Sequence, residues 1–130
     1  MSAIQNIHEL GSDSGLLLAI HGDRDEADRY HALALVFSNG VMTLRCDIDT
    51  DEVLVTTGHD VPGDLPHVAP DEDENLSGLE GMVLEYVWIM INHRGYRDGL
   101  QIRLLNLNSR EEQVRQFEVM ASAMTVRRVC

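Results

Sequence analysis

Hydrophobic and polar residues alternate along much of the chain, and clusters of Gly, Asn and Asp separate the alternating runs. Alternation of this kind is typical of strands that bury one face, and the clusters are typical of turns. Strands are predicted at residues 16–21, 52–57, 82–91 and 100–104. With 130 residues the chain is long enough to form one domain with its own core. We expect a single mainly β domain over residues 1–130, an antiparallel sandwich or partly open barrel of about six to eight strands with little helix.

A β-hairpin is predicted around Asn39-Gly40, because this dipeptide favours a two-residue type I′ turn. Such a turn places one apolar face of the hairpin toward the core, which predicts that Cys46 is a buried core thiol rather than a reactive one. Taken literally, the turn pairs Phe37 with Met42, Leu35 with Leu44 and Leu33 with Cys46.

The run 82–91 is rich in Val, Ile, Tyr and Trp, so we expect a strand that is buried on most of both faces. Its expected partner is the alternating run 100–104, and residues 92–99 join the two as a hairpin loop in which Gly95 is free to adopt a positive φ. The expected core combines both hairpins and consists of Leu33, Leu35, Phe37, Met42, Leu44, Val87, Trp88, Ile89, Ile102 and Leu104.

Residues 110–124 admit two interpretations. Val114, Phe117 and Met124 fit one face of a helix that Ser109 would cap. Alternatively, Phe117 alternates with polar residues as it would in a strand. We favour the strand, because an antiparallel sheet would otherwise leave exposed edges.

The chain has ten arginines, no lysine and 22 carboxylates, which gives a formal charge of −12. Without lysine, this chain alone cannot form a Schiff base or a P-loop phosphate site. The imbalance lies in residues 46–93, which hold twelve acids and no arginine, while the rest of the chain has ten acids and ten arginines. Such a block attracts basic proteins or divalent cations and repels nucleic acid, although a solvated surface that only aids solubility is the plainer interpretation.

Residues 58–78 hold all three prolines and are predicted to form a long acidic Pro/Gly loop. His59-Asp60 resembles the His-Asp pair of metal-dependent phosphohydrolases, and His67 lies close by in the sequence. Imidazole and carboxylate groups suit Zn²⁺ or Mn²⁺, whereas ordinary surface histidines are the plainer interpretation. The loop ends in a run of four candidate binding residues, Asp71, Glu72, Asp73 and Glu74.

The segment 92–99 combines an amide, an imidazole, two guanidiniums, a phenol and a carboxylate between two apolar strands. Tyr and Arg are favoured at protein interfaces, so the segment is a candidate binding-loop tip. In the alternative interpretation Asn92 and Asp98 only close the turn and Tyr96 packs back on the sheet. The candidate binding residues are Asn92, His93, Arg94, Tyr96, Arg97 and Asp98.

The stretch from Tyr86 to Gln101, with Trp88, Asn92, Gly95-Tyr96 and Asp98, resembles a family of small uncharacterised bacterial proteins, a domain of unknown function. The segment 117–122 is similar to the C-terminal strand of that family. The resemblance covers about the last third of the chain and implies no catalytic residue, cofactor or partner. The resemblance also implies an association with immunity-type proteins, because members of that family resemble neighbours of such proteins.

The N-terminal residues lack the features of a signal peptide, no apolar run is long enough to span a bilayer, and the two cysteines form no disulfide framework. We predict a cytoplasmic, non-enzymatic interaction protein without a cofactor that binds a basic protein partner through the acidic region, for example as an immunity or inhibitor protein. The alternative is a metal-dependent hydrolase that uses His59, Asp60 and His67. Neither nucleic acid nor a membrane is an expected partner, and a homodimer is the third hypothesis.

Overall fold

The computed structural model describes residues 14–129 with the exception of residues 48, 70, 121 and 122. Its regular elements are nine strands, and these described residues contain no helix. The number exceeds the expected range because residues 67–68 add a short strand inside the predicted loop. In chain order the strands are β1 (Leu17–Arg24), β2 (Tyr30–Phe37), β3 (Gly40–Asp47), β4 (Glu52–Gly58), β5 (His67–Val68), β6 (Val83–Ile91), β7 (Arg97–Leu105), β8 (Glu112–Met120) and β9 (Ala123–Arg128).

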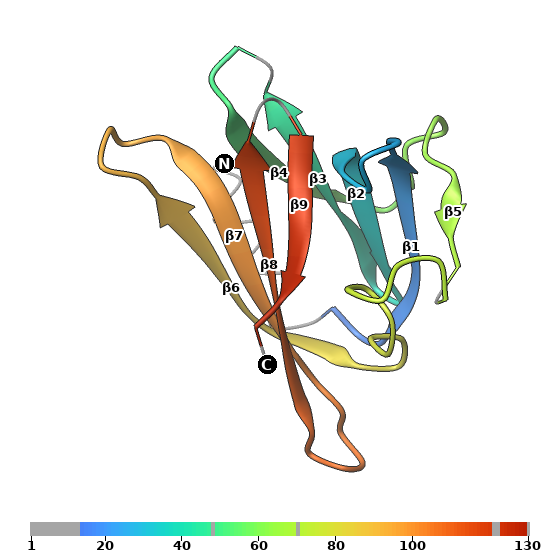
Figure 1. Ribbon diagram of the computed structural model, residues 1–130. Coiled ribbons are helices and arrows are strands. Elements are labelled where there is room, and N and C mark those ends of the chain that lie inside the picture. The colour runs from blue at the N-terminus through green and yellow to red at the C-terminus, as the bar shows by residue number, and fades with distance from the viewer. Residues whose placement is uncertain (1–13, 48, 70, 121–122, 130) are drawn as a thin grey trace.

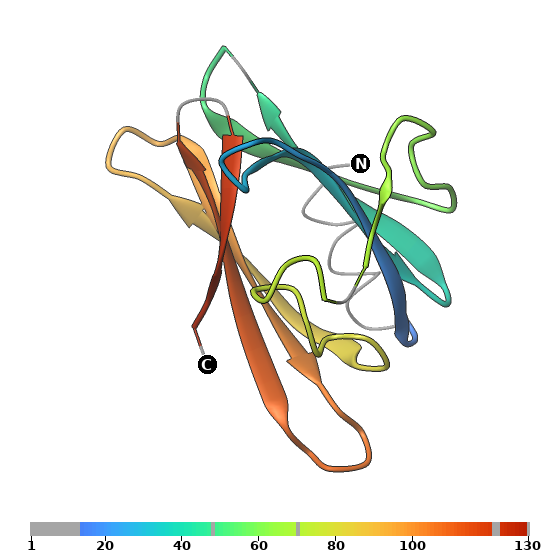
Figure 2. The same cartoon turned by 45° about the vertical axis from the view of Figure 1, so that its right-hand side comes forward.

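The strands belong to one antiparallel sheet that curls into a half-barrel (Figure 1). The order is β4-β3-β2-β9-β8-β7-β6, and β1 pairs with β2 and β5 beside this path. Strand β9 meets β2 at the single pair Tyr30–Met124, so β1–β5 and β6–β9 form two halves of the sheet. Figure 2 shows these halves facing each other. The fold is therefore mainly β, as expected. Within the described residues, no helix has the length and apolar character needed to cross a membrane.

The main core lies between the two halves and includes side chains from every strand. Its members occupy alternate positions, because one face of an antiparallel sheet is buried and the other is solvated. Of the predicted core, Val87 and Ile89 are partly buried against this cluster. The prediction is confirmed by full burial at Leu33, Leu35, Phe37, Met42, Leu44, Ile102 and Leu104.

The prediction that β6 is buried on most of both faces, with Trp88 in the core, is wrong. Strand β6 ends the path of the sheet, and β7 is its neighbour. Leu84 faces the core, whereas Tyr86 and Trp88 point to the outer face with 51% and 43% of their surface exposed. The continuous apolar run arises because the solvated face of this edge strand also carries large apolar side chains. Pattern alone does not distinguish that arrangement from burial on two sides.

The predicted hairpin exists, but its turn is displaced by one residue and its pairing by two. Strand β2 pairs Phe37 with Gly40, so the turn residues are Ser38 and Asn39. The prediction of a type I′ turn at Asn39-Gly40 is therefore wrong, and Asn39 does not have the positive φ that such a turn requires. The physical reason is a tertiary contact, because Ser38 N–H donates to Leu16 C=O and Asn39 N–H donates to Ser14 C=O.

A shift of two residues keeps every side chain of the hairpin on its predicted face. The observed pairs are Leu35–Met42 and Leu33–Leu44. Cys46 instead pairs with Val53 of β4, and its half-buried side chain contacts the core. Burial raises the pKa of this thiol to about 11, which disfavours the reactive thiolate as the sequence predicts.

The strand interpretation of the C-terminal region is confirmed. Strand β8 pairs with β7 on one side and with β9 on the other. Phe117 faces Leu100 across the first of these ladders and Val126 across the second, which buries it completely. The helix interpretation fails because both edges of β8 find strand partners.

Candidate functional site

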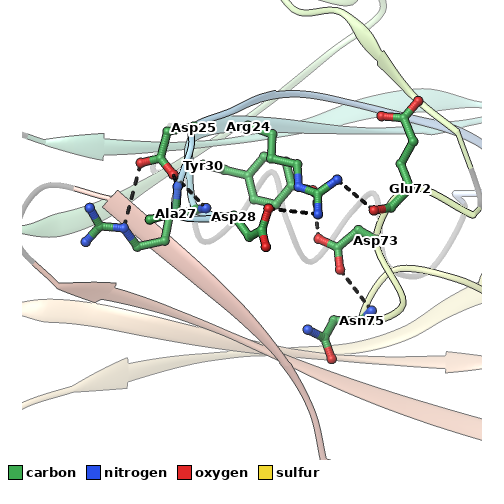
Figure 3. A network of polar contacts seen from close by, with 9 residues as sticks. Arg24, Asp25, Ala27, Asp28, Tyr30, Glu72, Asp73 and Asn75 are labelled. Carbon is green, nitrogen blue, oxygen red and sulfur yellow. Dashed lines mark hydrogen bonds and ion pairs between the residues drawn. The ribbon is translucent and has the colours of Figure 1, made fainter.

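Residues 71–77, here called the acidic segment, carry a run of carboxylates on a turn that is anchored by one inward-facing acid. Asp73 is buried, and it accepts a hydrogen bond from the Tyr30 hydroxyl at 2.8 Å. Its second oxygen accepts the Asn75 N–H at 2.9 Å, and its carbonyl accepts the Leu76 N–H at 3.0 Å. Figure 3 shows Asp73 directed toward Tyr30 of β2. The Asp73 carboxylate therefore fixes the turn from the inside.

Tyr30 is a neutral hydrogen-bond donor in this arrangement. Burial, and after it the hydrogen bond to Asp73, raises the pKa of the phenol well above its ordinary value. The ring lies over Gly22 of β1, where an added Cβ would approach Tyr30 Cδ1 to 2.8 Å and Leu33 Cδ2 to 2.7 Å. Gly22 thus leaves the space that the Tyr30 ring occupies.

Two arginines bind the backbone of the acidic segment. Arg115 of β8 has no exposed surface, and its Nε donates to the Asn75 carbonyl at 2.6 Å. Its Nη2 reaches the Ser77 carbonyl at 3.4 Å, and its Nη1 donates to Gln113 Oε1 at 2.9 Å. On the other side, Arg24 of β1 donates to the Glu72 carbonyl at 2.6 Å. Carbonyl acceptors stabilise both cations, and Arg24 also forms an ion pair with Asp28 at 2.9 Å.

The remaining acids of the segment are available at the surface. Asp71, Glu72 and Glu74 are exposed. Figure 3 shows the Glu72 carboxylate directed away from Asp73 and Tyr30, and it caps the Ala69 N–H at 3.1 Å. The four predicted acids therefore separate into one buried anchor and three surface groups.

Sequence reasoning missed Tyr30, Arg24 and Arg115. For Arg115 a signal was present, because alternation from Phe117 places residue 115 on the same inward face of a strand. An arginine at an inward position implies a buried polar partner. For Tyr30 and Arg24 no local signal existed, since their partners lie 43 and 48 residues away.

The second predicted site, residues 92–98, is here called the tip loop, and two of its polar side chains, Asn92 and Asp98, close its own turn. Asn92 Oδ1 accepts the N–H groups of Arg94 at 2.9 Å and Tyr96 at 3.2 Å. Its Nδ2 lies 3.4 Å from Asp98 Oδ2, and Gly95 has a φ of 86°, as expected. Asn92 and Asp98 thus close the turn. Tyr96, however, is 44% exposed and does not pack back on the sheet.

The three residues of the metal alternative lie in different environments. His59 and Asp60 follow β4, whereas His67 belongs to β5, and all three residues are exposed. The His67 ring meets His21 edge to face with a centroid separation of 5.4 Å, and His21 Nδ1 lies 3.1 Å from the Leu65 carbonyl. Within the described part of the chain, no three His, Cys, Asp or Glu residues form a group that could hold a metal ion.

The model of a family of unknown function, DUF6334, matches residues 12–130. This match extends well beyond the last third of the chain, where the sequence resemblance was found. No curated protein and no solved structure matches the chain.

Proposed function

The chain belongs to the DUF6334 family, and since the function of that family is unknown, we propose a function from the surface of the chain itself. We propose that it is a non-enzymatic interaction protein whose acidic segment binds a basic protein partner. The observation that carries this proposal is the separation of Asp73, which is buried as an anchor, from its exposed acidic neighbours.

Exposed carboxylates near the acidic segment make no ion pair within the described residues. This holds for Asp60, Asp64, Asp71, Glu74 and Glu80, all of which are exposed. Arg24 and Arg115 bind backbone carbonyls of the segment and not these carboxylates, so the carboxylates generate a negative field, which steers cationic surfaces toward them and raises the association rate. A basic partner is therefore the class of ligand that this surface fits.

The anchored backbone supports a role in binding. Arg24 and Arg115 bind carbonyls of the segment, and Tyr30 binds Asp73, so the turn is held before any partner arrives. A surface that is already ordered loses less conformational entropy on association than a mobile loop does. An immunity or inhibitor protein that binds a basic toxin in the bacterial cytoplasm is one concrete form of this proposal.

The test is capture of a partner from the native host, followed by measurement of its association rate at increasing salt. We expect a basic partner whose association slows as salt rises, because screening shortens the range of the field. The variant Asp71→Asn/Glu74→Gln is expected to associate more slowly. Its matched control, Glu26→Gln/Glu111→Gln, removes the same charge from two exposed positions outside the segment.

Two results would contradict the proposal. One is an association rate that does not change with salt. The other is an equal loss of rate in the segment variant and in its control, which would assign the effect to net charge rather than to the acidic segment.

A further inference from the structure

Strand β6 has an open edge along most of its length. At its start, Leu16 forms a bridge with Val83, and Leu17 N–H donates to the Met82 carbonyl. Beyond this point β7 pairs with one edge of β6, and no strand in the described residues pairs with the other. Residues 85–91 therefore present backbone hydrogen-bonding groups that a further strand can use.

Irregularities of the β6–β7 register lie only near the two ends of the open edge, between Leu84 and Tyr86 and between Met90 and Ile91, so residues 86–90 pair regularly with β7 and few of the devices that prevent strands from associating are present. The open edge contains no proline, and its one charged residue, Glu85, forms an ion pair with Arg103 at 3.3 Å. Large apolar side chains are exposed along it, with Tyr86 at 51%, Trp88 at 43% and Ile91 at 63%. An exposed, long and apolar edge strand is a template for pairing with another chain.

The outer face of this edge is already ordered. The rings of Tyr86 and Trp88 stack with centroids 5.4 Å apart and an interplanar angle of 21°. The guanidinium of Arg103 lies 5.4 Å from the Tyr86 centroid and 5.5 Å from the Trp88 centroid. Ordered aromatic and arginine side chains of this kind are typical of the residues that dominate binding at interfaces.

The two ends of β6 carry opposite charges. Arg94 and Arg97 of the tip loop follow the strand, and Glu80 precedes it. All three side chains are exposed, and within the described residues none of them makes an ion pair. In an antiparallel pair of two identical strands, the end of each strand lies beside the start of the other. Two copies of β6 would therefore bring each cationic tip loop to the Glu80 of the other copy.

We propose that the open edge of β6 is a homodimer interface, at which two copies of residues 85–91 pair antiparallel about a two-fold axis near Trp88, the midpoint of that range. Such an interface is self-complementary, as a two-fold axis requires. A second copy fits this edge better than a basic partner does. The edge has one cationic end and one acidic end, so an inverted copy of the same strand places opposite charges side by side, whereas a uniformly basic partner would be repelled at the cationic end. The interface uses none of residues 71–77, and Glu80 is the one carboxylate that it shares with the acidic surface described above.

The first experiment measures the mass and the tryptophan emission of the full chain over a range of concentrations. Sedimentation velocity is expected to show a reversible dimer. Because Trp88 is the single tryptophan of the chain, its emission is expected to shift to the blue over the same concentration range as it leaves water. A monomer at every concentration overturns the proposal, and so does a dimer that forms without any change in Trp88 emission.

The second experiment exchanges the two charges. Arg94→Glu is expected to weaken dimerisation by about tenfold, because two symmetric attractions become repulsions. Glu80→Arg is expected to weaken it as well, although this variant lowers the net negative charge of each chain. The double variant Arg94→Glu/Glu80→Arg restores the attraction and is expected to recover the affinity of the original chain.

Arg128→Glu is the matched control, because Arg128 is exposed on β9 and its reversal changes the net charge by the same amount as Arg94→Glu. All of these substitutions are at exposed positions, and circular dichroism checks that each variant is folded. If the control weakens the dimer as much as Arg94→Glu does, or if the double variant shows no recovery, the charged ends do not meet and the proposed pairing is wrong.

Discussion

The acidic segment and the tip loop are both polar turns at the surface, but they are held by different kinds of interaction. Side chains from three distant strands bind the acidic segment, namely Arg24, Tyr30 and Arg115. In the tip loop the organising residue is Asn92, which accepts hydrogen bonds from residues two and four positions further along the chain. The first turn therefore depends on the whole fold, and the second depends mainly on its own sequence.

This difference predicts different responses to perturbation. A segment that is tied to buried groups opens only when the core opens, whereas a locally closed loop opens by itself at a small free-energy cost. One link joins the tip loop to a distant part of the chain, a hydrogen bond of 2.9 Å from the Arg97 N–H to the Glu52 carboxylate. It lies at the surface, so it adds little stability compared with the buried contacts of Arg115.

The largest effect is expected for Arg115→Ala. The change removes a fully buried cation, leaves the carbonyls of Asn75 and Ser77 without their donor, and opens a cavity. We expect the free energy of unfolding, measured by urea titration, to fall by about 3–5 kcal/mol. Arg128→Ala is the control, because Arg128 pairs with Arg115 across the ladder but is exposed, and we expect a change within about 0.5 kcal/mol. A loss below about 1 kcal/mol for Arg115→Ala would show that this arginine does not anchor the acidic segment.

The next effect is expected for Gly22→Ala, which tests the space beneath Tyr30. The new Cβ would lie within 3 Å of both the Tyr30 ring and the Leu33 side chain, so one of them must move. We expect a loss of about 1–3 kcal/mol in thermal or urea unfolding. Gly58→Ala is the matched control on β4, since a Cβ there meets no atom within 4 Å. If the two variants unfold alike, the position of the Tyr30 ring does not depend on Gly22.

Tyr30→Phe removes the hydroxyl that binds Asp73 and is expected to lower the free energy of unfolding by about 1–2 kcal/mol at neutral pH. The same variant has a pH signature. The pKa of Tyr30 is raised in the folded protein, so the stability contributed by its neutral form is complete below the ordinary pKa of about 10 and is lost as pH rises above it. The phenylalanine variant is expected to lose less stability above that pH than the original chain.

Ionisation of Cys46 also lowers the free energy of unfolding in alkaline solution, because the pKa of this thiol is raised from 9.0 to about 11 in the folded protein. The comparison of Tyr30 with phenylalanine is therefore made in a Cys46→Ala background, so that the thiol contributes nothing to the slope. Equal slopes for the two chains in alkaline solution would contradict a buried neutral phenol at position 30.

The sequence supports prediction of the tip loop more fully than prediction of the acidic segment, for a physical reason. Asn92, Gly95 and Asp98 act on their immediate neighbours, so their residue types alone indicate the turn. Glu72 and Asp73 look alike in sequence, and the side chain that distinguishes them is Tyr30, which lies more than 40 residues earlier. Which acid is buried could be known only after β2 was placed beside the segment.

Prediction of the fold from local sequence has the same limit, because contacts between distant residues are not visible in it. Alternation predicted the faces of β2 and β3 correctly, because a strand has a period of two whatever its partner is. The register differed because Leu16 and Ser14 bind the turn at Ser38 and Asn39, a contact that local turn chemistry does not contain. The exposure of Trp88 was missed because an apolar run does not reveal whether a second layer covers it.

The smallest effect is expected for Asn92→Ala, and it completes the contrast between the two surfaces. The change removes the acceptor of the Arg94 and Tyr96 N–H groups, but both groups lie at the surface and can bind water instead. We expect the free energy of unfolding to fall by no more than about 1 kcal/mol.

In hydrogen exchange, the amides of Arg94 and Tyr96 are expected to exchange faster while those of the acidic segment do not change. His93→Ala is the control, an exposed residue of the same loop, and it is expected to leave these rates unaltered. If Asn92→Ala also accelerates exchange at Asn75 and Leu76, the tip loop and the acidic segment are coupled, and the division between local and global support is wrong.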